Sequence, residues 1–270
     1  MSAFQDSNNK LTTLFRVLLF YISSTVIFIG SSILVKLLPP RMANYLSLFL
    51  SAVLTLLLVH LFAKWENIRL TNTGVVPGNK SILRFLAGIG IGLMLPLIQA
   101  LILVGYGHLT LVRINDISGT QMLAAGLLYL LVATREELVF RSYALRRLNQ
   151  QLGSSVAVAI ITVIFIAEHI IAGMPWLVAI IGSGLGAVLF GIAALKTKGL
   201  ALPLGLHAAW NFGQWSLGFK GEPGIWKALT ASGYEQQMQQ VGLGAFVVAM
   251  LSGILLVLIL YRKMPVQETN

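Results

Sequence analysis

The sequence contains no cysteine. This absence excludes disulfide bonds, zinc sites built on thiolates, a cysteine nucleophile and S-palmitoylation. Any chemistry must therefore come from carboxylates, histidine, serine, threonine, tyrosine, asparagine or a bound metal ion. Internal repeats and low-complexity tracts are also missing, and no segment has the composition of a soluble domain.

Charged residues are scarce as well. They make up 10% of the 270 residues, whereas 57% are apolar. A soluble domain carries about 25% charged residues, and apolar residues in this number supply about seven or eight spans of ~20 residues each. The composition therefore predicts an all-α, polytopic membrane protein, with one integral membrane domain over residues 1–270.

The apolar residues are grouped in segments separated by short connections that contain Pro, Gly or Asn. The segments cover about 16–38, 44–63, 82–106, 120–135, 154–172, 176–195, 200–218 and 241–261. The first is longer than the core of a signal peptide, which favours a retained span. We therefore expect about eight transmembrane helices, the fourth of which continues as a helix past Arg141.

The net charge of +10 reflects basic residues in the short connections, which indicates membrane orientation and not nucleic-acid binding. With both termini in the cytoplasm, fourteen of the 19 Lys and Arg residues lie on the inner side. The inner set is Lys10, Arg16, Lys64, Arg69, Lys80, Arg84, Arg135, Arg141, Arg146, Arg147, Lys196, Lys198, Arg262 and Lys263. The outer set is Lys36, Arg41, Arg113, Lys220 and Lys227. This asymmetry predicts cytoplasmic termini. On this view Arg146 and Arg147 act only as determinants of topology. Together with the compact connections, the asymmetry favours a multi-pass protein of the plasma (inner) membrane, and an organelle membrane is the alternative.

Five ionisable residues lie within apolar sequence. They are Glu136, Glu137, Glu168, His169 and His207. Such groups are costly in hydrocarbon and usually face a bundle interior or a water-filled cavity. They are therefore the candidates for a functional site, although the sequence assigns no role to Glu168.

Hairpin geometry places three of these residues at a similar depth. Glu136 and His169 each lie about 16 residues, or ~25 Å, from an expected turn at Gly153. His207 lies about eight residues, or ~12 Å, inside the loop 196–198. We therefore expect a shared pocket in the inner half of the bilayer, open toward the cytosol.

The same residues belong to three short motifs. EExxxR runs from Glu136 to Arg141, FxxxH from Phe165 to His169, and HxxxN from His207 to Asn211. Residues four apart share a helix face, so Glu137 and Arg141 can form an ion pair, whereas Glu136 is rotated by about 100°. The two glutamates can therefore take different roles.

With these motifs, in this order and on separate helices, the sequence resembles the CAAX protease and bacteriocin-processing (CPBP/Abi) family of intramembrane proteases, which includes the type II CAAX prenyl endopeptidases. The resemblance covers about residues 120–215, which would form the catalytic core. It implies an endopeptidase that cleaves a peptide bond in or beside the membrane.

The resemblance also implies residue roles. Glu136 with His169 would activate a water molecule, Glu137 and Arg141 would organise the site, and His207 with Asn211 would stabilise the oxyanion. These roles are chemically reasonable, because a carboxylate can act as a general base and imidazole and amide N–H groups can donate to an oxyanion.

Two alternatives stay open. In the first, zinc is the cofactor and Glu136, Glu137, His169 and His207 are its ligands. The HExxH pattern is absent, so we expect no cofactor. The second is a membrane immunity or transport protein without catalysis, because buried carboxylates and histidines also form proton relays. The expected partners are the lipid bilayer and a peptide or protein substrate, lipid-modified or membrane-inserted, but no nucleic acid.

Overall fold

The structure is a computed structural model that describes residues 10–262 and is nearly all helical. Its helices are α1 (Lys10–Leu34), α2 (Pro40–Trp65), the 3-10 turn η2 (Leu70–Thr73), α3 (Ser81–Gly105), α4 (Gly119–Arg141), α5 (Tyr143–Leu152), α6 (Ser154–Ile171), α7 (Trp176–Val178), the π turn η3 (Ala179–Ser183), α8 (Gly184–Thr197), α9 (Ala201–Ser216) and α10 (Glu235–Leu260). Each predicted apolar segment coincides with a helix. Residues 1–9 and 263–270, and with them both termini, lie outside the described residues.

Six helical segments of the described chain are long and apolar enough to cross a membrane. They are α1, α2, α3, α6, α10 and the continuous run from α7 to α8. The other two predicted spans are α4, which carries Arg135, Glu136 and Glu137, and α9, which has 16 residues. Large apolar side chains are exposed on the outer helices, as expected for faces in contact with lipid. The chain is therefore a multi-pass membrane protein, and the count of eight spans stays a prediction.

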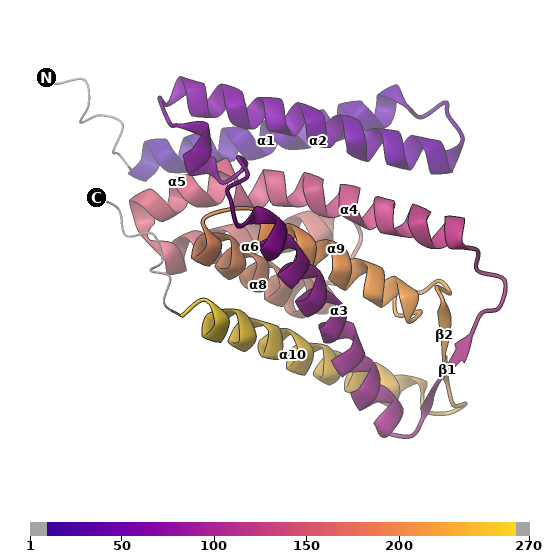
Figure 1. Cartoon of the computed structure of the whole chain (residues 1–270). Helices are drawn as coiled ribbons and strands as arrows, with labels where there is room; N and C mark the ends of the chain where they lie inside the picture. The colour runs from indigo at the N-terminus through magenta and orange to yellow at the C-terminus, as the bar shows by residue number, and fades with distance from the viewer. Residues whose placement is uncertain (1–9, 263–270) are drawn as a thin grey trace, which may run out of the picture.

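The helices form a bundle in which successive long helices run in opposite directions (Figure 1). The start of α1 and the end of α10 lie at the same end of this bundle (Figure 1). We call this end the terminal end. We call the opposite end, which carries the two paired β-strands, the hairpin end. These strands are β1 (Leu109–Arg113) and β2 (Trp226–Thr230), paired antiparallel. The all-α prediction missed this sheet, because two five-residue strands in distant connections give no pattern of their own.

The region around α4 and α5 differs from one continuous helix. α4 begins at a capping box, in which Ser118 and Gln121 each bond the other's backbone N–H. The predicted continuation past Arg141 is wrong in one respect: the backbone breaks at Ser142 (φ −84°, ψ −113°) before α5 starts. The predicted turn near Gly153 is confirmed, because this glycine has a φ of 82° and separates α5 from α6.

Helices α3 and α9 pack backbone against backbone. A Cβ atom on Gly92 would lie 2.4 Å from the Leu206 carbonyl oxygen, and one on Gly88 would lie 2.3 Å from that of Leu202. Small residues four apart permit this close approach between membrane helices. The packing fixes α9, the helix that carries His207 and Asn211.

Candidate active site

A cavity of about 660 Å³ lies inside the bundle. Glu136 on α4, His169 on α6, and His207 and Asn211 on α9 all line it. The structure thus brings together, from three helices, four of the six residues to which the sequence assigned a role in the site. The remaining two, Glu137 and Arg141, are buried directly behind them.

His207 lies between the two glutamates. Its Nδ1 is 2.9 Å from Glu137 Oε1 and its Nε2 is 3.7 Å from Glu136 Oε2. The ring also stacks on Phe190, with centroids 4.4 Å apart and an interplanar angle of 16°. The glutamates differ in environment, since the side chain of Glu137 is 1% exposed and that of Glu136 is 15% exposed. Glu137 can therefore hold the ring while Glu136 faces the cavity.

Arg141 completes the buried layer behind the cavity. Its Nη1 lies 3.4 Å from Glu137 Oε1, which confirms the predicted i,i+4 ion pair. Its guanidinium carbon is 4.7 Å from the ring centroid of Phe165 and 5.4 Å from that of Phe190. The aromatic faces and the carboxylate compensate part of the cost of removing this charge from water, because the guanidinium nitrogens themselves have no hydrogen-bond partner among the described residues.

His169 is oriented by its own helix. Its Nδ1 is 2.9 Å from the backbone oxygen of Phe165, one turn earlier. When Nδ1 donates to this carbonyl, Nε2 carries the lone pair of the neutral ring. In the FxxxH motif, Phe165 thus gives His169 both a backbone carbonyl acceptor and a ring contact, with the two ring centroids 4.4 Å apart. The imidazole in direct contact with Glu136 is that of His207, so Glu136 and His169 share the cavity wall without an ion pair between them in the described contacts.

Glu168, which the sequence left without a role, points toward α1 and α4. Its Oε1 is 2.6 Å from Arg135 Nη1, and Tyr21 donates a hydrogen bond of 3.4 Å to Oε2. This ion pair joins the residues that directly precede Glu136 and His169, in agreement with the predicted match in depth. Arg135 therefore neutralises Glu168 and is not the partner of Glu136 or Glu137.

Amide side chains and one lysine in the cavity wall were not predicted. Gln99 and Gln214 line the cavity and bond to each other at 2.6 Å, and Lys220 donates a hydrogen bond of 3.0 Å to Asn211 Oδ1. The sequence carries a signal for the two glutamines, because both lie in apolar helices. Lys220 gives no such signal, since it lies in a connection where topology alone explains a basic residue.

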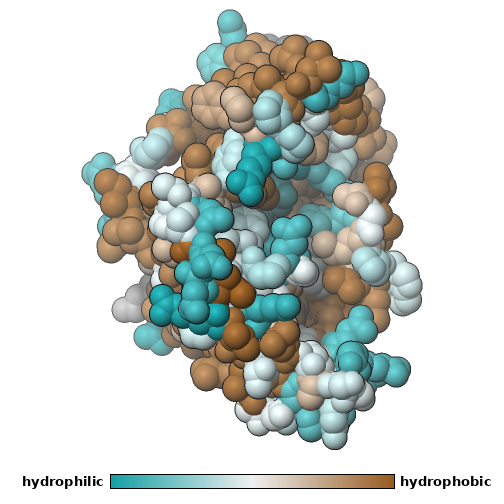
Figure 2. Space-filling view, turned by 90° about the vertical axis from the view of Figure 1, so that its right-hand side faces the viewer, coloured by the Kyte–Doolittle hydropathy of each residue, from teal (hydrophilic) through white to brown (hydrophobic). Residues whose placement is uncertain are grey.

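The cavity opens at the hairpin end. Its outer wall includes Met174 before α7, Lys220 after α9, and Gln236 in the first turn of α10. Figure 2 shows this end of the molecule, where hydrophilic residues surround a recess. The predictions of cytoplasmic termini and of a pocket open to the cytosol therefore cannot both be right. The depth argument fixed a distance from the Gly153 turn but contained no information on which end of the bundle is closed.

Helix α5 contributes to closing the terminal end. Arg146 Nη2 donates to the Ala194 carbonyl oxygen at 2.9 Å, and Arg147 Nε donates to Glu66 Oε2 at 2.5 Å. Tyr143 also donates to Glu66. The interpretation of Arg146 and Arg147 as determinants of topology alone is wrong, because both are buried and bind neighbouring helices.

The alternative zinc ligands do not form a ligand set in this structure. Across residues 10–262, no group of three or more His, Asp or Glu side chains is arranged to hold a metal ion. Glu137 and His207 bond to each other, and His169 Nδ1 faces a backbone carbonyl. In this arrangement the four side chains do not fit a zinc ion.

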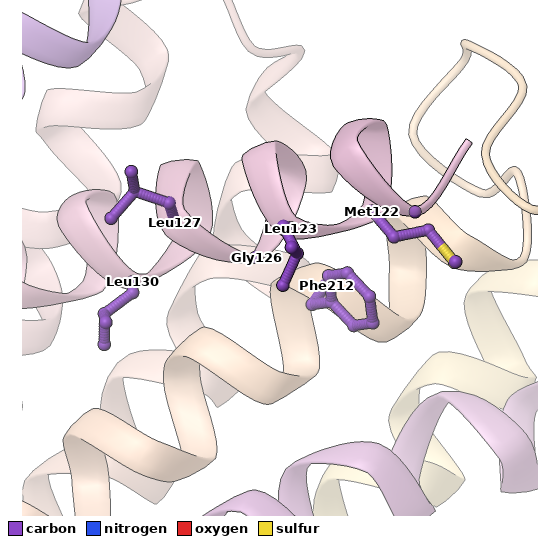
Figure 3. Close-up of a pocket in the computed structure, with 7 residues that line it drawn as sticks. Met122, Leu123, Gly126, Leu127, Leu130 and Phe212 are labelled. Carbon is purple, nitrogen blue, oxygen red and sulfur yellow. The ribbon is translucent and has the colours of Figure 1, made fainter. Parts of the chain in front are cut away.

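A second cavity, of about 690 Å³, lies between α4 and α9 (Figure 3). Its wall consists of Gly119, Met122, Leu123, Gly126, Leu127, Leu130 and Phe212. None of these side chains can titrate or form a hydrogen bond of any strength, so this groove suits a lipid chain and carries no chemistry. The polar cavity is therefore the candidate active site.

The comparison with protein families agrees with this choice. Residues 118–213 match the family described as Type II CAAX prenyl endopeptidase Rce1-like. The match starts at the cap of α4 and contains all three motifs, which confirms the resemblance seen in the sequence. No curated protein matches the chain at a significant level.

Proposed function

We propose that the protein is an intramembrane endopeptidase. The match of residues 118–213 to the Rce1-like family of type II CAAX prenyl endopeptidases supports this proposal. The protein cleaves a peptide bond in or beside the membrane with a water molecule activated by Glu136 and His169. The observation that carries this proposal is the shared cavity lined by Glu136, His169, His207 and Asn211.

The residues support the following sequence of steps. Glu136 removes a proton from a water molecule in the cavity, and the resulting hydroxide attacks the carbonyl carbon of the substrate. His169 Nε2 is free to accept a hydrogen bond from the same water. The carbonyl oxygen becomes an oxyanion, and the protonated Glu136 then returns the proton to the leaving amine as the C–N bond breaks.

The oxyanion is stabilised by donors on α9. When His207 is doubly protonated, Nδ1 donates to Glu137 and Nε2 donates into the cavity. Asn211 supplies a second donor from the same helix face, one turn later. Preorganised donors of this kind lower the barrier because they need no reorientation as charge develops.

Substitution of Glu136 tests the proposal. Glu136→Gln keeps the shape of the side chain but removes the base, so cleavage should be abolished while the protein still folds. New peptide termini in membranes that contain the wild-type protein, and their loss with the variant, measure this effect. Glu235→Gln, an exposed carboxylate at the start of α10, is the matched control and should keep full activity. Full cleavage by the Glu136→Gln protein would contradict the proposal.

Metal dependence is decided by a separate measurement. We propose that the reaction needs no cofactor, and elemental analysis of purified active protein should find zinc below one atom per chain. Stoichiometric zinc, together with loss of activity on chelation, would establish the zinc-dependent alternative.

We also propose a single integral membrane domain over residues 1–270, with eight spans, both termini in the cytoplasm and the active-site cavity open on the opposite side of the plasma (inner) membrane. The substrate is a peptide or protein, with or without a lipid modification. The distribution of Lys and Arg supports the orientation. The position of the cavity at the hairpin end then gives the side from which a substrate enters.

A further inference from the structure

Lys220 is a basic side chain in the wall of the active-site cavity, although it follows the end of α9. Two contacts hold its ammonium group. Nζ donates to Asn211 Oδ1 at 3.0 Å and lies 5.0 Å from the ring centroid of Tyr129 on α4. The lysine thus connects the proposed oxyanion donor on α9 with the helix that carries the proposed base.

The chain turns back after α9 to make these contacts. α9 ends at Ser216, and Gly218 reverses the chain with a φ of 75°. A Cβ atom at this position would lie 2.7 Å from the Trp226 carbonyl oxygen, so only glycine fits. The reversal brings Lys220 back beside Asn211, which lies more than one helical turn before the end of the helix.

The chemistry of the ammonium group determines the orientation of the amide. An ammonium group has three donors and no acceptor, so Asn211 must present its oxygen to Lys220. Nδ2, the donor end of the amide, is therefore turned away from the lysine. Without this contact the amide can rotate and present either end to a bound peptide.

We propose that Lys220 is a positioning residue that fixes Asn211 with Nδ2 as the donor to the oxyanion. This inference rests on the proposed function, because it assumes that an oxyanion forms beside Asn211. The positive charge also lies near the site where negative charge develops, which adds to the stabilisation of the transition state.

The surroundings of Lys220 give the expected pH dependence. Although the Lys220 side chain is partly exposed to solvent, protein atoms around its ammonium group displace water and lower its pKa, while the charge of Glu136 acts in the opposite direction. Tyr129 on α4 also faces the ammonium group, and Glu222, two residues further along the same loop, acts electrostatically on Tyr129. A lowered pKa means that the protonated form is complete below this value and is lost as pH rises through it. Activity should therefore fall on the alkaline side at a lower pH than a fully solvated lysine would give.

Five variants test the inference, each assayed for cleavage of one substrate that the wild-type protein cuts. Lys220→Met should lower kcat by about tenfold with little change in KM, which is less than the ~100-fold or more expected for loss of an oxyanion donor. Lys220→Arg, which can still donate and stays protonated, should recover most of kcat and move the alkaline limb to higher pH. Lys227→Met, an exposed lysine on β2, is the matched control and should keep wild-type activity.

The fourth variant is Asn211→Ala, and the fifth combines Asn211→Ala with Lys220→Met. If Lys220 acts through Asn211, its removal should change kcat by less than about twofold once Asn211 is absent, because residues in one network are not additive. Two fully additive effects, an unchanged kcat in Lys220→Met, or an unmoved alkaline limb in Lys220→Arg would each overturn the inference. A wild-type protein without Glu136-dependent cleavage would instead overturn the proposed function. Thermal unfolding in detergent shows whether a variant is misfolded. If Lys220→Met or the double variant is misfolded, the pH profile of Lys220→Arg alone decides whether Lys220 positions Asn211.

Discussion

Glu137 and Arg141 place two opposite charges behind the cavity, with side chains that are 1% and 0% exposed. Their closest atoms are 3.4 Å apart, and Glu137 also binds His207. Removal of one partner from a buried pair leaves an uncompensated charge, which is more damaging than removal of both. The pair is therefore expected to hold the geometry of the site and to contribute to stability at the same time.

Arg141→Met should lower the free energy of unfolding by about 3–5 kcal/mol, because Glu137 then has only His207 as a partner for its charge. The double variant Glu137→Gln with Arg141→Met should be more stable than Arg141→Met alone, since a glutamine can still accept from His207 without a buried charge. Chemical unfolding in detergent measures both. A double variant that is less stable than the single one would show that the ion pair is not what stabilises this layer.

At the scale of the helix, the close packing of α3 and α9 positions His207 and Asn211. Gly92→Ala puts a methyl group 2.4 Å from the Leu206 carbonyl oxygen, immediately before His207. We expect a lower unfolding temperature and reduced cleavage, because α9 must move to accommodate this atom. Gly90→Ala is a control in the same helix, since a Cβ there meets nothing within 4 Å. It should be neutral or stabilise the helix by up to ~1 kcal/mol. Equal effects of the two substitutions would contradict the packing argument.

Patterns of apolar and ionisable residues predicted the helices and much of the candidate site. Each of the eight apolar segments coincides with a helix, and six of the helical segments have the length and composition that a bilayer demands. Glu136, His169 and His207 could be selected because ionisable groups rarely lie in such segments without a cavity or partner. The break at Ser142, by contrast, depends on tertiary packing of α5, whose arginines bind Ala194 and Glu66 from distant parts of the chain.

Lys220 and the β1–β2 sheet could not be predicted for the same reason. Lys220 becomes part of the site only because Gly218 reverses the chain against Trp226. β1 and β2 pair although α4 to α9 and more than a hundred residues separate them along the chain, so their pairing depends on how the intervening helices are arranged. No pattern in a single sequence indicates that the residues joined by such contacts meet. The side on which the cavity opens could not be predicted either, because it depends on which end of the bundle the connections leave uncovered.

At the scale of the whole molecule, the orientation in the membrane decides which compartment supplies the substrate. Lys and Arg are concentrated at the terminal end, which predicts that this end is cytoplasmic, and the cavity opens at the other end. The absence of cysteine makes the chain a template for accessibility labelling at single introduced thiols. Gln236→Cys lies at the mouth of the cavity, and Lys198→Cys is an exposed position in the loop after α8.

In intact cells, a membrane-impermeant maleimide should label Gln236→Cys, and it should label Lys198→Cys only after the membrane is permeabilised. The unsubstituted protein, which has no thiol, measures non-specific labelling. The reverse pattern would place the hairpin end in the cytoplasm. The cavity would then open to the cytosol, and the excess of positive charge would lie outside. The positive-inside argument would fail for this protein, but the geometry of the active site would be unaffected. Equal labelling of both positions in intact cells would instead show that the two ends are not separated by a bilayer, which would contradict the membrane-spanning arrangement itself.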